Sequence, residues 1–124
     1  MAEVTVKRVE DFEYYKGEHA IPGIRFCYAG RNLGVTAWGM NVLEMEPDCA
    51  GHPEHDHVKD GQEEVYVVLR GSATLQASGE EWRLEPGVLV RVGPKQKRKI
   101  VAGPEGATIL AMGATPGKAY EPRR

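Results

Sequence analysis

The chain has 124 residues, which is the length of one domain with a single hydrophobic core, so we expect one domain over residues 1–124. Lys and Arg number 16 and Asp and Glu 18, and this near-balance does not favour a nucleic-acid backbone or an anionic membrane surface as a partner. No apolar run approaches the about 18 residues of a membrane-spanning helix, and the N-terminal segment alternates and carries acidic residues. We therefore expect a cytoplasmic protein without a signal peptide, with Cys27 and Cys49 reduced.

Short β-rich runs fill the chain, whereas no segment keeps the periodicity of an amphipathic helix. Strands are predicted at residues 4–8, 23–28, 35–38, 41–46, 64–69, 73–76, 81–84, 88–92, 99–102 and 107–113. Glycine and proline predict chain reversals within residues 69–72, 77–81, 84–88 and 103–107. This pattern predicts an antiparallel β-sandwich or β-barrel, with helical turns only near residues 11–15.

Three of the four histidines lie within the six residues from His52 to His57. Residues two apart on a strand point to the same face, so His55 and His57 can reach one ion, whereas His52 has the opposite parity and is expected at the surface. The next strand begins at Glu64, whose carboxylate can face the two imidazoles from a neighbouring strand. Two imidazoles and one carboxylate suit iron, manganese, nickel, cobalt or zinc and leave coordination positions open.

These residues resemble the first motif of the cupins, which contains His-x-His, then a glutamate and, after six further residues, a glycine. His55, His57, Glu64 and Gly71 fall into this frame, while Cys49 stands at the motif's first glycine and the spacer before Glu64 is longer than usual. The resemblance covers residues 41–113 and implies an all-β double-stranded antiparallel β-barrel of the jelly-roll type. It leaves residues 1–34 as N-terminal strands packed on the barrel and residues 114–124 as a tail.

The second cupin motif is eroded, because counting from Gly87 places Arg98 where the family has a metal-binding histidine. Strand parity predicts that Arg98 points inward with the apolar Ile100, while Lys97 and Lys99 face solvent. A guanidinium has no free lone pair and cannot bind a metal, and its charge repels a divalent ion. Arg98 therefore either turns away from the ion or replaces it as the partner of Glu64.

Three interpretations of function follow, so the sequence does not decide whether the protein is an enzyme. The first is a mononuclear metal enzyme with ligands His55, His57 and Glu64, in which Arg98 grips a substrate anion and Tyr66 lines the pocket or donates a proton. Oxygenase or isomerase chemistry is what the resemblance implies. The second is a metal-free module that recognises a small anionic ligand through Arg98 without turnover. In the third, the barrel is an interaction or structural unit whose pocket has decayed.

The run from Val65 to Leu69 is apolar on both strand faces, so both faces of this strand are expected to be covered. One face fills the barrel. The other needs either the chain's own N-terminal strands or a second subunit. Because similar proteins commonly dimerise through such a face, we expect a homodimer that binds a small-molecule ligand.

Overall fold

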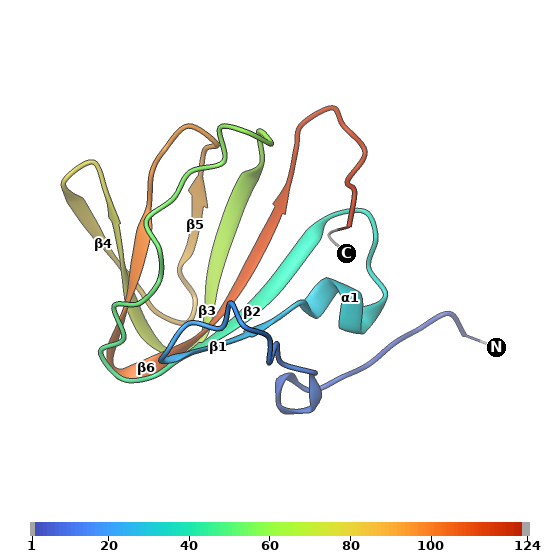
Figure 1. The fold of residues 1–124 in the computed structure, drawn as a ribbon, viewed down its shortest axis with the longest axis horizontal. Helices are drawn as coiled ribbons and strands as arrows, with labels where there is room; N and C mark the ends of the chain where they lie inside the picture. Colours follow the sequence, from blue (N-terminus) through green and yellow to red (C-terminus); the bar gives the residue numbers. More distant parts are fainter. Residues whose placement is uncertain (1, 123–124) are drawn as a thin grey trace.

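Figure 1 shows the fold in a computed structural model, which describes residues 2–122. Its strands are β1 (Ile24–Cys27), β2 (Gly39–Met45), β3 (Glu63–Ala77), β4 (Glu80–Leu84), β5 (Leu89–Val92) and β6 (Lys99–Ala114). The helical elements are a 3-10 turn, η1 (Val9–Asp11), and one short helix, α1 (Ala29–Leu33). All strand pairs are antiparallel, which confirms the all-β prediction. No helix in the described part of the chain is long and apolar enough to cross a membrane.

The strands form a curved sheet in the order β1-β2-β6-β3-β4, with β5 paired to β3 (Figure 1). The two long strands, β3 and β6, pair with each other along most of their length. The first half of β3 also pairs with β5, and its second half pairs with β4. β3 and β6 therefore extend from one end of the barrel to the other. Most of the side chains in its interior belong to these two strands.

Two predicted chain reversals, at residues 69–72 and 103–107, are wrong. At both places the strand continues, and the pairing of β3 with β6 shifts register between Val68 and Ala73. Gly71 has φ +77°, and a Cβ there would lie 2.1 Å from the carbonyl oxygen of Gly106. Glycine is needed here because the two backbones touch where both strands bend, so the glycines mark a bend and not a turn.

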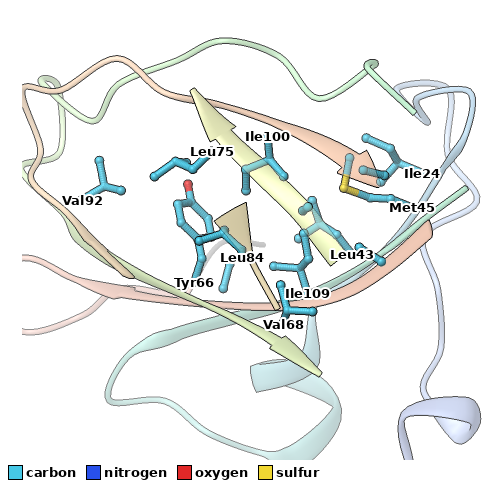
Figure 2. Close-up of a cluster of buried hydrophobic side chains, with 14 residues drawn as sticks. Ile24, Leu43, Met45, Tyr66, Val68, Leu75, Leu84, Val92, Ile100 and Ile109 are labelled. Atoms are coloured by element: carbon cyan, nitrogen blue, oxygen red, sulfur yellow. The ribbon is translucent and has the colours of Figure 1, made fainter. Parts of the chain in front are cut away.

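The core fills the interior of the curved sheet (Figure 2). Its buried members come from every strand and include Leu43, Tyr66, Leu75, Ile100 and Ile109. In the first part of β3 the buried Glu64, Tyr66 and Val68 alternate with half-buried residues, as strand parity predicted. Both cysteines are free, as expected.

Two predicted strands are absent from the described structure, at residues 4–8 and 35–38. The first is extended but pairs with no strand, and its Val4 and Val6 side chains are 72% and 86% exposed. An alternating segment becomes a strand only where a sheet edge accepts its backbone hydrogen bonds. Residues 35–38 instead connect α1 to β2, and α1 itself was not predicted because five residues are too few to show helical periodicity.

The outer face of β3 is covered only in part. Val65 and Val67 are half-buried, while Leu69 is 40% exposed. Phe12 and Tyr14 from the N-terminal segment pack on the outer cluster formed by β1, α1 and β2, further along the same sheet. The chain's own N-terminus therefore covers one part of this face and leaves the part over β3 and β5 open.

Candidate functional site

The segment that carries His55 and His57 is an irregular loop and not the strand that the parity argument assumed. His55 forms an isolated antiparallel bridge with Arg98, in which each backbone N–H donates to the other residue's carbonyl, at 3.0 and 2.9 Å. Two residues further on, the His57 N–H donates to the Pro94 carbonyl at 2.8 Å. This pairing keeps the loop extended, so both imidazoles lie on the same side, as they would on a strand.

The polar side chains predicted for the site converge on one carboxylate oxygen of Glu64, near the start of β3. Its Oε1 accepts hydrogen bonds from the Tyr66 hydroxyl at 2.6 Å and from Arg98 Nη1 at 3.0 Å. His57 Nε2 lies 3.1 Å from this oxygen, and His55 Nε2 lies 3.8 Å from it. The inward grouping of these residues is confirmed, while their roles toward a metal or a ligand stay predictions.

Glu64 is a carboxylate across the physiological pH range. Burial by itself would raise the pKa of Glu64, because an apolar environment disfavours the charged form. The interactions with His55 and Tyr66 and the charges of His57 and Arg98 outweigh burial and lower this pKa to about 2. The contact with Glu64 likewise raises the pKa of His55, against the opposing effect of burial. The site is thus held together by a buried negative charge.

Arg98 is the largest fully buried side chain, with 0% of its surface exposed. Besides the bond to Glu64, its Nη2 donates to the Gly93 carbonyl at 2.9 Å, and its Nε has no hydrogen-bond partner among the described residues. Ile100 is also fully buried, so the inward direction predicted from parity is confirmed. Arg98 therefore places a permanent positive charge beside the two imidazoles.

Asp60 belongs to the site, although the sequence analysis did not single it out. Its two carboxylate oxygens lie 3.1 and 3.2 Å from His57 Nδ1, and one of them also accepts the Gln62 N–H at 3.1 Å. Because a carboxylate only accepts hydrogen bonds, Asp60 keeps a proton on His57 Nδ1, and a proton on Nε2 in its contact with Glu64 would have to leave before that atom could bind a metal. The three-residue spacing from His57 to Asp60, across the turn at residues 58–60, was the available signal.

The three predicted ligands fit a divalent transition metal. One ligand atom from each of His55, His57 and Glu64 lies within 4.8 Å of the others. Metal bonds of about 2.0–2.2 Å to nitrogen and oxygen place neighbouring ligand atoms roughly 3–3.6 Å apart, so only small movements would close the set around an ion. The charge of Arg98, which is bonded to the same carboxylate, works against such an ion.

His52 was expected at the surface, and the structure corrects this: only 5% of it is exposed. The Ile100 N–H donates to His52 Nδ1 at 3.1 Å, and the His52 ring packs beside the His55 ring, with centroids 5.3 Å apart. The prediction from strand parity failed because the segment is not a regular strand. His52 can therefore be buried although its side chain does not share the direction of His55 and His57. Burial, and next the charge of His55, lower the pKa of His52 to about 4.

A histidine held neutral in this way should make stability depend on pH. The lowered pKa means that His52 stabilises the fold above the ordinary pKa of 6.5 and that this contribution declines as pH falls toward about 4. The variant His52→Asn keeps a side-chain acceptor for Ile100 but does not titrate. From pH 7.5 to 6.0 the parent should lose about 1 kcal/mol relative to His52→Asn in urea unfolding. If the difference in unfolding free energy between the parent and His52→Asn is the same at both pH values, the His52 imidazole accepts a proton in the folded protein without loss of stability.

Tyr66, the candidate proton donor, lies in the core. Its ring is part of the main apolar cluster, and its hydroxyl donates to Glu64. Burial, together with the Glu64 charge, raises its pKa well above the usual range. Its predicted role in proton transfer or substrate binding stays a prediction, and its observed contacts orient the Glu64 carboxylate.

A cavity of about 730 Å³ opens beside the site and reaches the His57 and Glu64 side chains. Its walls come from β1, α1, the α1–β2 connection, β2, β6 and the C-terminal segment; they include Phe26, Tyr28, Arg31, Trp38, Asn41, Asp60, Gln62, Lys118, Tyr120 and Glu121. Neither Tyr66 nor Arg98 is among the described residues that line it. Most of the cavity wall thus comes from segments outside the two motifs, whose proximity the sequence did not indicate.

Comparison with known proteins finds similarity in structure only. No protein-family model matches the chain, and no curated protein sequence matches it. A sugar phosphate isomerase of the cupin superfamily from Silicibacter pomeroyi superposes with a TM-score of 0.75 at 21% identity, covering 90% of this chain and 77% of that one. A cupin protein from Bacteroides fragilis gives 0.67 at 22% identity, covering 99% and 93%. KdgF from a Halomonas species gives 0.66 at 18% identity, covering 94% of each chain.

These superpositions cover 90%, 99% and 94% of this chain. The antiparallel all-β architecture and the position of Glu64 near the start of β3 agree with the resemblance seen in the first motif. This chain is therefore a small single-barrel protein with the cupin jelly-roll fold.

Proposed function

We propose that this protein is a small-molecule cupin that holds a divalent transition metal between His55, His57 and Glu64 and acts on a ligand in the adjoining cavity. The observation that carries the proposal is the convergence of two imidazole nitrogens and one carboxylate beside the cavity, whose lining includes His57 and Glu64. Isomerisation of a small phosphorylated or acidic sugar is the chemistry we favour. It is supported by the polar and charged side chains in the cavity lining and by solved structures of the same fold whose names describe sugar phosphate isomerases.

The chain's own residues supply the rest of the site. Asp60 keeps the Nδ1 proton of His57 in place, so that Nε2 is directed toward Glu64 and the cavity. Tyr66 and Arg98 hold the Glu64 carboxylate in one orientation. A bound divalent ion would supply Lewis acidity toward a substrate carbonyl or hydroxyl oxygen. Glu64, His57 and Asp60 are titratable groups that line the cavity beside that position.

A metal-free binding module is the second candidate, because one observation favours it specifically. The buried guanidinium of Arg98 already supplies a cation to Glu64, and this ion pair satisfies the carboxylate without a metal. In this alternative the cavity recognises its ligand without turnover. Arg98 then acts through Glu64, since its own side chain has no exposed surface.

Metal analysis of protein purified without an affinity tag or a chelator separates the two candidates. We expect bound transition metal in the parent, saturable binding of nickel or manganese by calorimetry, and loss of that binding in His55→Gln and His57→Gln. His19→Gln, at an exposed histidine remote in sequence from the site, is the matched control and should bind like the parent. A parent that contains no metal and binds none at millimolar nickel would leave the metal-free module.

We also propose that the protein is a homodimer, with a second copy on the open part of the outer face. Leu89 on β5 is 67% exposed beside the half-buried Val67, and burying such side chains stabilises an interface. Light scattering at micromolar concentration should give the mass of two chains. Leu89→Lys should shift the mass toward one chain, whereas Val58→Lys, at an exposed valine in the loop after His57, should not. A monomeric parent would contradict the proposal.

A further inference from the structure

We infer that three neutral polar side chains in the cavity lining, Asn41, Gln62 and Tyr120, form a hydroxyl-recognition strip for a sugar or a related polyol. The inference deepens the proposed function and rests on it only in taking the cavity as the ligand site. It names the groups that select the hydroxylated body of the ligand, whereas the proposed metal ligands concern its reacting end. The sequence motifs assign no role to any of the three residues.

The register of the sheet places two glycines in line with Glu64. Glu64 of β3 pairs with Gly113 of β6, which in turn pairs with Gly39 of β2. Figure 1 shows these three strands side by side. Parity with Leu43 on β2 and with Ile109 on β6, both core residues, directs the two glycine positions into the barrel. Because neither glycine has a side chain of its own, the interior beside the carboxylate is left to other segments over two strand spacings, about 10 Å.

The Gln62 amide occupies the first of these positions, next to Glu64. A Cβ at Gly113 would lie 3.1 Å from Gln62 Oε1 and 3.2 Å from Glu64 Cγ, so both side chains flank the same point. The Gln62 backbone is fixed there, because its N–H donates to Asp60 Oδ1 at 3.1 Å. Gln62 thus brings an uncharged donor and acceptor beside the carboxylate that lies 3.1 Å from His57 Nε2.

Tyr120 and Asn41 continue this line toward β2. A Cβ at Gly39 would lie 3.0 Å from the Tyr120 hydroxyl, which therefore covers the second glycine position. Asn41 is two residues further along β2, so its side chain is directed to the same face as that position. Its neighbour across the sheet, Ala111, is small and lines the same cavity. Together with Gln62, these side chains make a strip of neutral hydrogen-bonding groups that begins beside the carboxylate.

The polar side-chain atoms of the strip have no partner within the described chain. Asn41, Gln62 and Tyr120 are half-buried, and none of their side chains makes a hydrogen bond or an ion pair with another described residue. By contrast, the side-chain amides of Asn32 and Gln76, outside the cavity lining, each donate to a neighbouring residue. A ligand that covers the strip without hydrogen-bonding to it would leave these groups unpaired, which is unfavourable. The strip therefore favours a ligand that brings polar groups of its own.

This arrangement suits a ligand with several neighbouring hydroxyl groups. A carboxamide and a phenol can each donate and accept, as an alcohol can, so each pairs with a hydroxyl in either sense. A site built to bond substrate hydroxyls rejects an analogue that lacks them, because its own polar groups are then left unpaired. Since the strip is uncharged, it recognises the body of the ligand and not a terminal acid group.

Glucitol 6-phosphate and hexyl phosphate test the strip directly, because they share a carbon chain and a terminal phosphate and differ in the hydroxyl groups. In calorimetric titration of the protein as purified, glucitol 6-phosphate should have a Kd at least about tenfold lower. The uncharged pair of glucitol and 1,6-hexanediol should show the same order, which separates hydroxyl recognition from any contribution of the phosphate. Trp38 lines the cavity, so binding should also change its fluorescence in the Trp82→Phe background, where it is the one remaining tryptophan.

The variants assign the preference to the strip. Gln62→Met combined with Asn41→Ala should reduce the preference for glucitol 6-phosphate to less than about twofold, and Tyr120→Phe should reduce it in part. Asn41→Ser, which keeps a donor and an acceptor, should retain more of it than Asn41→Ala. Gln76→Met, at a glutamine of β3 outside the lining, should retain all of it. A preference that survives in the double variant overturns the inference. So do equal affinities of the two probes for the parent, or the absence of both heat and Trp38 fluorescence change at millimolar probe.

The proposed metal function and the strip fail in different ways. Asn41 and Tyr120 are not among the predicted metal ligands, so Asn41→Ala and Tyr120→Phe should bind nickel like the parent. A parent that binds no metal but prefers the hydroxylated probe would remove the metal function and leave the strip. A parent that binds nickel and does not distinguish the probes would overturn the inference and leave the metal function.

Discussion

Replacing Arg98 with histidine is expected to raise the affinity of the site for nickel or manganese at least about tenfold, which corresponds to about 1.4 kcal/mol. The change removes a buried positive charge that is bonded to Glu64 at 3.0 Å, and it adds an imidazole at the position that provides a ligand in the cupin motif. Both effects favour a divalent ion, because like charges in a partly buried site repel strongly and a fourth ligand closes the coordination. Calorimetric titration of folded parent and variant is the measurement.

Arg98→Gln is the matched control, because it removes the charge without adding an imidazole. Its affinity should lie between those of the parent and Arg98→His, and the two steps divide the gain into relief of repulsion and new ligation. Lys97→His, at the exposed neighbouring position, should bind like the parent. Equal affinities of parent and Arg98→His would mean that Arg98 does not oppose the ion. Weaker binding in the variant would mean that the guanidinium supports the site.

Glu64→Gln is expected to lower the free energy of unfolding at pH 7 by about 3 kcal/mol. The variant keeps the side-chain shape but leaves the guanidinium of Arg98 buried without a counter-charge, and breaking one side of a buried pair typically costs about 3–5 kcal/mol. The lowered pKa of Glu64 supports a loss of stability of the same size. A shift from 4.5 to about 2 corresponds to about 3 kcal/mol of stabilisation, with Glu64 itself mostly buried.

The pH dependence of this difference is the sharper test. Because the folded pKa is lowered, the contribution of Glu64 is complete above pH 4.5 and declines as pH falls through about 2. The gap between parent and Glu64→Gln in urea unfolding should therefore narrow to about 1 kcal/mol at pH 3. The double variant Glu64→Gln with Arg98→Met should recover part of the loss, because no buried charge remains. A gap below about 1 kcal/mol at pH 7 would show that Arg98 needs no partner.

The sequence was informative wherever local pattern and burial pointed the same way. His55, His57 and Glu64 were placed together because their spacing in the motif survives an irregular backbone: two hydrogen-bonded contacts with the neighbouring segment keep the histidine loop extended. Arg98 was placed inward because an apolar residue two positions along shares its side of the chain. The all-β class followed from short runs separated by glycine and proline.

The errors arose where the outcome depends on a distant partner. Residues 4–8 alternate like a strand, but no sheet edge in the described chain accepts them. Gly71 and Gly106 were interpreted as turns, whereas they let two long strands bend against each other, which depends on the contact between their backbones. His52 became a buried acceptor for Ile100 because the loop folds over the start of β6.

The sequence by itself determined the fold class. It also determined the charges and spacing of the side chains in the central site and the fact that they point inward, because alternation along a strand decides which side chains enter the core. Only the tertiary structure decided that Arg98 bonds to Glu64, that Asp60 orients His57, and that α1 and the C-terminal segment enclose a cavity above them. These are contacts between segments far apart in the chain. Their formation depends on how the whole barrel packs, which no local pattern records.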